Sequence, residues 1–110
     1  MTDKKDASSD EATLQRLQMI EQSAHAQGAQ RAAHQAQLNE TENALRELLV
    51  AKESHRIIGN IMVKVDPAVL SKELEEKRAT LVARVASVER QETKLREEMQ
   101  KLQDSILKGD

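Results

Sequence analysis

The feature that most constrains the fold is a run of apolar residues in the second half of the chain, spaced at alternating steps of four and three. This spacing predicts a helix that presents a narrow seam to another helix, as in a coiled coil. A seven-residue repeat in the first half suggests the partner helix. The seam positions of the second half, eight of them apolar, are Leu74, Arg78, Leu81, Val85, Val88, Glu92, Leu95, Met99, Leu102 and Ile106. Those of the first half are Leu17, Ala24, Arg31, Leu38 and Leu45, with Ile20 and Leu48 at the intervening positions of the repeat.

A short segment rich in β-branched residues separates the two periodic regions. It runs from His55 to Val65 and has Gly59-Asn60 at its centre. Gly accepts the positive φ that a two-residue primed turn requires, so this segment predicts a β-hairpin. A buried helical kink is the alternative, and the isoleucines on both sides of the Gly-Asn pair argue against it.

The boundaries of the elements follow from capping signals. Ser8 to Glu11 match a capping box, whereas Asp66 and Pro67 suit the N-cap and the first position of a second helix. Gly109 suits the C-terminal stop of that helix. We therefore expect one domain over 1–110, with a disordered tail over 1–7, a helix over 8–54, a hairpin over 55–65 and a helix over 66–108.

Folding the chain back at the predicted turn pairs residues whose numbers add up to about 119. Leu38 then faces Leu81, and Leu17 faces Leu102, so apolar layers form near the hairpin and near the termini. Between them the first seam is interrupted by polar residues, of which Arg31 is one. The predicted fold is mainly α, a long antiparallel two-helix coiled coil joined by one short hairpin.

Composition excludes several classes of function. The chain has no Phe, Tyr, Trp or Cys, and its formal charge of −2 is spread over both signs. It therefore offers neither a basic face nor aromatic platforms for nucleic acid. No apolar run approaches the roughly 18 residues of a membrane span. Its three histidines lack the spacing of metal ligands, and no nucleophile has a base at a supporting position. We expect that the chain is not an enzyme, that it has no catalytic, metal or cofactor site, and that it lies in the cytoplasm.

The hairpin requires partners. A two-stranded hairpin alone is marginal in water and leaves two open edges, and closing a barrel with strands of other subunits removes those edges. We therefore predict an intersubunit β-barrel. Its interface residues are Ile57, Ile58, Gly59, Asn60, Ile61, Met62, Val63 and Val65.

Several stretches of the sequence resemble the beta-class subunits of the prefoldin family, the archaeal form most closely. The segment from Gln37 to Leu48 resembles the family's helix that leads into the hairpin, and the segment from Gly59 to Val65 is similar to its turn and second strand. Two shorter segments, Glu73 to Lys77 and Val88 to Glu92, resemble parts of its second helix. The resemblance spans roughly Gln35 to Leu107.

The resemblance implies a hexamer of two alpha-class and four beta-class subunits, whose hairpins form two barrels. It also implies an ATP-independent holdase that binds unfolded proteins at the coiled-coil tips and delivers them to the cytosolic group II chaperonin. The tip residues would be Leu14, Leu17, Met19, Ile20, Met99, Leu102, Ile106 and Leu107. Their alternative role is to seal the end of the coiled coil. The alternative function is a structural or adaptor coiled coil that oligomerises through its hairpin.

Overall fold

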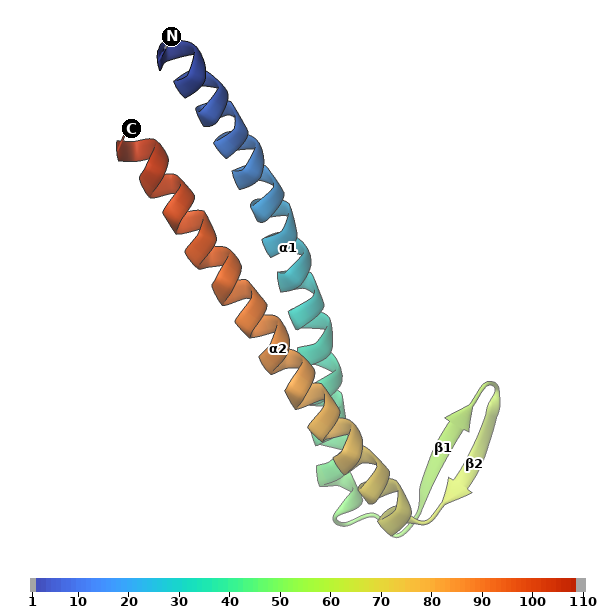
Figure 1. Cartoon of the computed structure of the whole chain (residues 1–110). Coiled ribbons are helices and arrows are strands. Elements are labelled where there is room, and N and C mark those ends of the chain that lie inside the picture. Colours follow the sequence, from blue (N-terminus) through green and yellow to red (C-terminus); the bar gives the residue numbers. More distant parts are fainter. Residues whose placement is uncertain (1, 109–110) are drawn as a thin grey trace. The chain divides into compact units, whose positions relative to one another are not determined.

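The chain folds into two long helices with a two-stranded hairpin between them (Figure 1). The computed structural model describes the backbone of residues 2–108 and the side chains of residues 10–108. The elements are α1 (Thr2–Leu48), β1 (Ser54–Ile58), β2 (Ile61–Val65) and α2 (Pro67–Lys108). The predicted order of helix, hairpin and helix is therefore confirmed. The predicted stop at Gly109 lies outside the described residues.

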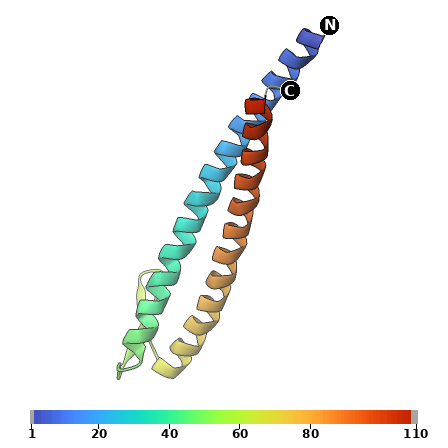
Figure 2. The same ribbon diagram turned by 90° about the vertical axis from the view of Figure 1, so that its left-hand side faces the viewer.

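Each helix contributes to two compact units. The terminal unit comprises Met1–Arg31 and Ser87–Asp110, and the hairpin unit comprises Ala32–Ala86. Within each unit, the segments of α1 and α2 lie side by side and run in opposite directions (Figure 1; Figure 2). The predicted antiparallel pairing of two helices is therefore confirmed.

The apolar seam forms the core of each unit. In the hairpin unit, Leu81 is 1% exposed and Leu38 is 7% exposed, as expected if they face each other in one layer. In the terminal unit, Ile20 and Val88 are buried. Every predicted seam position of α2 is buried or half-buried except Arg78, whose long polar side chain is exposed. Removing these apolar groups from water is the main favourable term that pairs the helices.

Polar residues interrupt the seam of the terminal unit, as predicted. Arg31 donates a hydrogen bond from Nε to Glu92 Oε1 at 2.6 Å, in an ion pair that is partly buried. Gly28 lies beside the same carboxylate, because a Cβ added there would lie 3.9 Å from Glu92 Oε2. Gln27 Oε1 is buried without a hydrogen-bond partner, which costs on the order of 1–3 kcal/mol. This layer therefore adds less stability than the apolar layers.

The boundaries of α1 differ from the prediction at both ends. The helix begins at Thr2 and not at Ser8, because residues 2–7 contain no Pro or Gly and include good helix formers. The proposed capping contact of Ser8 lies outside the described side chains. At the other end α1 stops at Leu48 and not at Ser54. Two backbone hydrogen bonds between residues three apart close the helix, from Leu49 N to Arg46 O and from Val50 N to Glu47 O. The chain needs the next five residues to turn from a helix into a strand.

The hairpin turns at the predicted pair of residues. Gly59 has a φ of +60°, whereas Asn60 does not have a positive φ, the pattern of a type II′ turn. This turn sets an antiparallel register in which Ile58 pairs with Ile61 and Ser54 pairs with Val65. Strand β1 thus begins one residue earlier than predicted.

The second helix starts as its capping signal predicts. The Asp66 carboxylate accepts a hydrogen bond from Ala68 N at 2.9 Å, and the Asp66 carbonyl accepts one from Leu70 N at 3.0 Å. Pro67 occupies the first helical position, where its missing N–H removes no intrahelical bond. One residue therefore connects β2 to α2.

The helix register is testable by cross-linking, because the natural chain contains no Cys. We expect the double variant Leu38→Cys/Leu81→Cys to form a disulfide within one chain under mild oxidation, since facing seam residues come close enough for a bridge. The control Leu38→Cys/Leu74→Cys places the second thiol two turns away in the same unit. Bridging of the control but not of the first pair, on a non-reducing gel, would show that the register is different.

Candidate functional site: the exposed apolar surfaces

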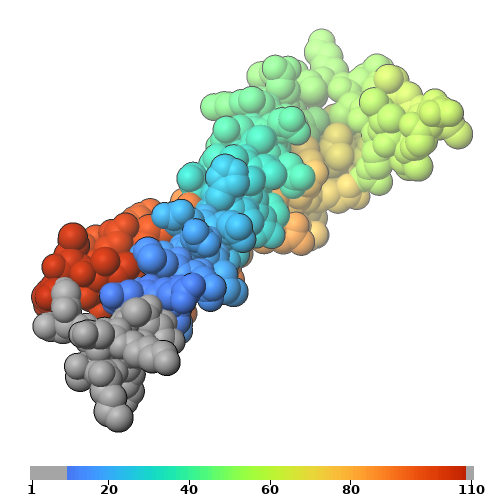
Figure 3. Space-filling model, turned by 90° about the horizontal axis from the view of Figure 1, so that it is seen from above, coloured from blue at the N-terminus to red at the C-terminus, as the bar shows by residue number. Residues whose placement is uncertain are grey.

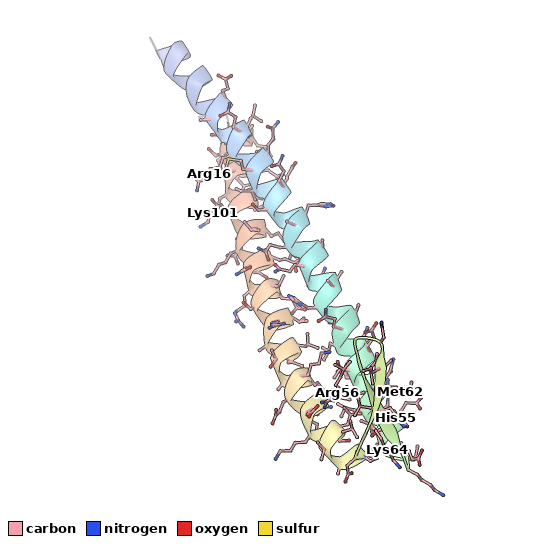
Figure 4. The ribbon with its side chains drawn as sticks, turned by 90° about the vertical axis from the view of Figure 1, so that its right-hand side faces the viewer. Arg16, His55, Arg56, Met62, Lys64 and Lys101 are labelled. Atoms are coloured by element: carbon pink, nitrogen blue, oxygen red, sulfur yellow. The ribbon has the colours of Figure 1, made fainter. Side chains whose placement is uncertain are left out.

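The hairpin presents two different faces. Because side chains alternate along a strand, the register assigns Ser54, Arg56, Ile58, Ile61, Val63 and Val65 to one face, which we call the Ile61 face. The other, the Met62 face, carries His55, Ile57, Met62 and Lys64. Arg56 lies on the side of the hairpin next to α2, and His55, Met62 and Lys64 lie on the other side (Figure 4).

Both faces expose large apolar side chains near the turn. Ile61 and Met62 are each 65% exposed although they lie on opposite faces, and Ile57, Ile58 and Val63 are also exposed. In the space-filling view, the hairpin surface, light green to yellow, is not covered by the helices on the side shown (Figure 3). Five exposed apolar groups on two strands of five residues each form a surface that is typical of an interface.

The root of the hairpin is held more firmly than its turn. Ser54 is buried, and its hydroxyl donates a hydrogen bond to the carbonyl of Val65 at 2.6 Å. On the Ile61 face the Arg56 guanidinium forms an ion pair with the Glu73 carboxylate of α2. Lys64 reaches Glu53 across 3.4 Å, close to the limit for a hydrogen bond. The hairpin is thus fastened at its root while its apolar part remains uncovered.

The second candidate surface lies in the terminal unit. The eight side chains predicted for it fall into two groups by burial. Ile20 is buried, and Leu17, Met99, Leu102 and Ile106 are half-buried, as expected for seam residues. Leu14, Met19 and Leu107 are exposed beside the seam. The ion pair between Arg16 Nη2 and Glu98 Oε1, at 2.7 Å, joins the two helices in the same unit.

Sequence reasoning missed a third exposed apolar group. Leu49 and Val50, in the connection that follows α1, are 82% and 84% exposed, and Val69 in the first turn of α2 is exposed as well. The signal for Leu49 and Val50 in the sequence is that the apolar run continues past the last seam residue, Leu48, into positions that cannot face α2. All three lie in the hairpin unit, so they enlarge the apolar surface of the unit that carries the hairpin.

In the part of the chain that the structure describes, no three His, Asp or Glu side chains lie close enough to hold a metal ion. None of the described helices is apolar over a stretch long enough to cross a membrane. The hairpin surface and the exposed apolar groups of the terminal unit therefore remain the candidate functional surfaces.

Comparison with known proteins places the whole architecture in one family. A family model described as "Prefoldin subunit" matches residues 11–108. The "Prefoldin subunit beta" of Archaeoglobus fulgidus is 38% identical over 93 residues, which cover 82% of this chain and 80% of that protein. The protein of the same name from Thermococcus onnurineus is 34% identical over 87% of this chain and 79% of its own length.

A solved structure agrees with these sequence matches. The crystal structure of the prefoldin beta subunit from Thermococcus strain KS-1 superimposes with a TM-score of 0.84 at 30% identity, over 89% of each chain. The matched region includes both helices and the hairpin, and the resemblance predicted from the sequence is confirmed. The chain belongs to the prefoldin subunit family, as one of its beta subunits.

Proposed function

We propose that this chain is a subunit of a cytoplasmic, ATP-independent holdase, in which hairpins assemble the complex and the terminal units bind unfolded proteins. As a prefoldin subunit, the chain is a chaperone component that acts in protein folding and assembles with other prefoldin subunits. The family is non-enzymatic, which confirms the expectation that the chain is not an enzyme. The proposal adds which surfaces carry out each task, with the whole chain acting as one prefoldin-like domain.

The observation that carries the proposal is the uncovered apolar surface of the hairpin. The Ile61 face carries four apolar side chains, at positions 58, 61, 63 and 65, and suits the filled interior of a small barrel. Burying one such side chain contributes ~1.5–3 kcal/mol, so several together can offset the cost of association. We propose a hexamer of two alpha-class and four beta-class subunits, with the hairpins forming two barrels.

The terminal unit is the proposed client-binding tip. Leu14, Met19 and Leu107 are exposed although the seam does not require them, and unfolded proteins expose apolar segments that such groups can cover. Methionine is flexible and suits a surface that must accept many shapes. The half-buried Leu17, Met99, Leu102 and Ile106, with Ile20, supply the rest of the surface if the helix ends part.

A client that contacts several tips at once is bound more tightly than a client at a single tip. One apolar side chain contributes only ~1.5–3 kcal/mol to a client contact, which corresponds to weak binding. Several tips of one complex raise the effective concentration for each other, and the client is released as single contacts open. Such reversible holding needs no nucleotide, and it suits delivery of the client to the cytosolic group II chaperonin.

Two matched variants test the assembly. Ile61 and Met62 are neighbours with equal exposure on opposite faces of the hairpin. We expect Ile61→Glu to prevent assembly with an alpha-class subunit, because a carboxylate buried without a partner costs several kcal/mol. Met62→Glu should weaken assembly less than Ile61→Glu does, because the Met62 side chain lies on the outer face of the proposed barrel, and native mass spectrometry measures both. A full-size complex of the Ile61→Glu variant would contradict the proposed role of the Ile61 face.

A second set of variants tests the tips. The triple variant Leu14→Gln/Met19→Gln/Leu107→Gln removes exposed apolar groups and leaves the seam residues in place, so the complex should assemble. We expect it to suppress aggregation of a chemically unfolded protein much less than the natural complex, measured by light scattering. Val82→Gln, which removes an exposed apolar group in the hairpin unit, is the matched control.

The aggregation assay also separates the proposal from its alternative. If the triple variant protects as well as the natural complex, clients bind elsewhere than at the terminal unit. If the natural complex itself does not suppress aggregation, the structural or adaptor function gains support instead.

A further inference from the structure

The hairpin meets α2 at a stiff junction. Only Asp66 lies between the last residue of β2 and Pro67, the first residue of α2. The proline ring fixes its own φ and restricts the conformation of the residue before it. Asp66 is restrained further by the hydrogen bonds that it accepts from Ala68 N and Leu70 N. The root of the hairpin is therefore placed directly by the start of α2.

A single junction does not determine the direction in which the hairpin points. Small rotations about the backbone of Asp66 would swing the turn through a wide arc. The second connection, from α1 to β1, is five residues long and lies outside helix and strand, so it restrains the hairpin less. The hydrogen bond of Ser54 to Val65 joins the two strands to each other and leaves their direction free.

The Arg56–Glu73 ion pair supplies the second point of attachment. Arg56 lies on β1, opposite Val63, and Glu73 lies six residues after the start of α2, about 9 Å along the helix axis. Among residues 10–108, this is the one hydrogen-bonded ion pair that joins a strand to α2. The junction at Asp66 and the ion pair together restrain the direction of the hairpin, which the junction alone does not.

We propose that Arg56 and Glu73 are positioning residues that hold the hairpin at the angle to α2 at which other subunits can pair with it. The inference rests on the proposed assembly through the Ile61 face. Strands of a closed barrel must share one tilt, so a hairpin already held at that tilt loses less conformational freedom on assembly. Both side chains are partly exposed, so the pair adds little to the folding stability of the separate chain, and its effect is to limit the directions that the hairpin takes before assembly.

Charge reversal with rescue tests this role. We compare Arg56→Glu, Glu73→Arg and the exchanged pair Arg56→Glu/Glu73→Arg, each mixed with an alpha-class subunit. Each single reversal should raise the dissociation constant by about two- to five-fold for every hairpin affected, and the effects multiply over the copies in the complex. The exchanged pair should recover most of the loss. Mass photometry over a dilution series measures these constants.

A distance measurement on the separate chain examines the direction itself. Spin labels attached to Asn60→Cys and Lys77→Cys report the separation between the turn and α2, since the natural chain has no Cys. We expect a narrow distribution for the natural pair and for the exchanged pair, and a broad one for each single reversal. Glu53→Lys, which reverses a charge in the Lys64–Glu53 pair without touching α2, should leave the distribution narrow.

The outcomes distinguish this inference from the proposed function. If the single reversals assemble and orient as the natural chain does, and Ile61→Glu still blocks assembly, the positioning role is wrong and the proposed assembly stands. An exchanged pair as weak as the single reversals would also overturn it, because the two residues would then contact a partner and not each other. If the Ile61→Glu variant assembles fully, the proposed assembly through that face fails, whatever the ion pair does.

Discussion

The pairing set by the Gly59-Asn60 turn is the constraint on which the rest of the structure depends. A two-residue turn leaves no freedom in the strand register, so Ile58 must pair with Ile61 and Ser54 with Val65. Leu38 and Leu81, whose numbers have the same sum of 119 as the paired strand residues, are both buried in the hairpin unit. Glycine is needed at the first turn position because φ there is +60°, which side chains disfavour. Replacing it would disturb the strands before it disturbed the helices.

The hairpin that this turn forms has an apolar surface that the rest of the chain does not cover. The helices use their narrow seam on each other, and the large apolar side chains that α2 leaves exposed in the hairpin unit are Val69 and Val82. The hairpin therefore keeps Ile57, Ile58, Ile61 and Met62 exposed, and the nearby Leu49 and Val50 add to that surface. The sequence has no aromatic residue and few buried positions, and we propose that other subunits cover the apolar surface that remains, as assembly with prefoldin subunits allows.

Much of this architecture is predictable from the sequence because it rests on periodicity and on turn chemistry. The seam of α2, the Gly59-Asn60 turn and the Asp66 cap all have local signals, and the structure has each of them. The end of α1 has no such signal, since no Pro or Gly marks Leu48 and the stop depends on where the strand must begin. Cross-element ion pairs were also missed. The predicted register places Arg31 opposite Val88, yet its long side chain reaches Glu92, and Arg56 likewise reaches Glu73.

The candidate surfaces likewise include some that the sequence predicts and one that it does not. The hairpin surface was predictable because alternation along a strand assigns each residue to a face, and the seam assigns Leu14, Met19 and Leu107 to positions outside it. Leu49 and Val50 belong to neither pattern, and only the course of the chain after α1 exposes them. A residue outside a helix or strand cannot be assigned to a buried or an exposed side before the course of the connection is known.

Hydrogen exchange at the strand edges tests most directly whether the hairpin is completed by other subunits. Ile58 and Ile61 close the turn as a hydrogen-bonded pair, so the amides of His55, Ile57, Met62 and Lys64 point outward to the open edges. We predict that these four amides exchange rapidly in the separate chain and at least about a hundred-fold more slowly in the complex with an alpha-class subunit. Equally rapid exchange in an assembled complex would show that its subunits associate without pairing their strands, and would contradict the account.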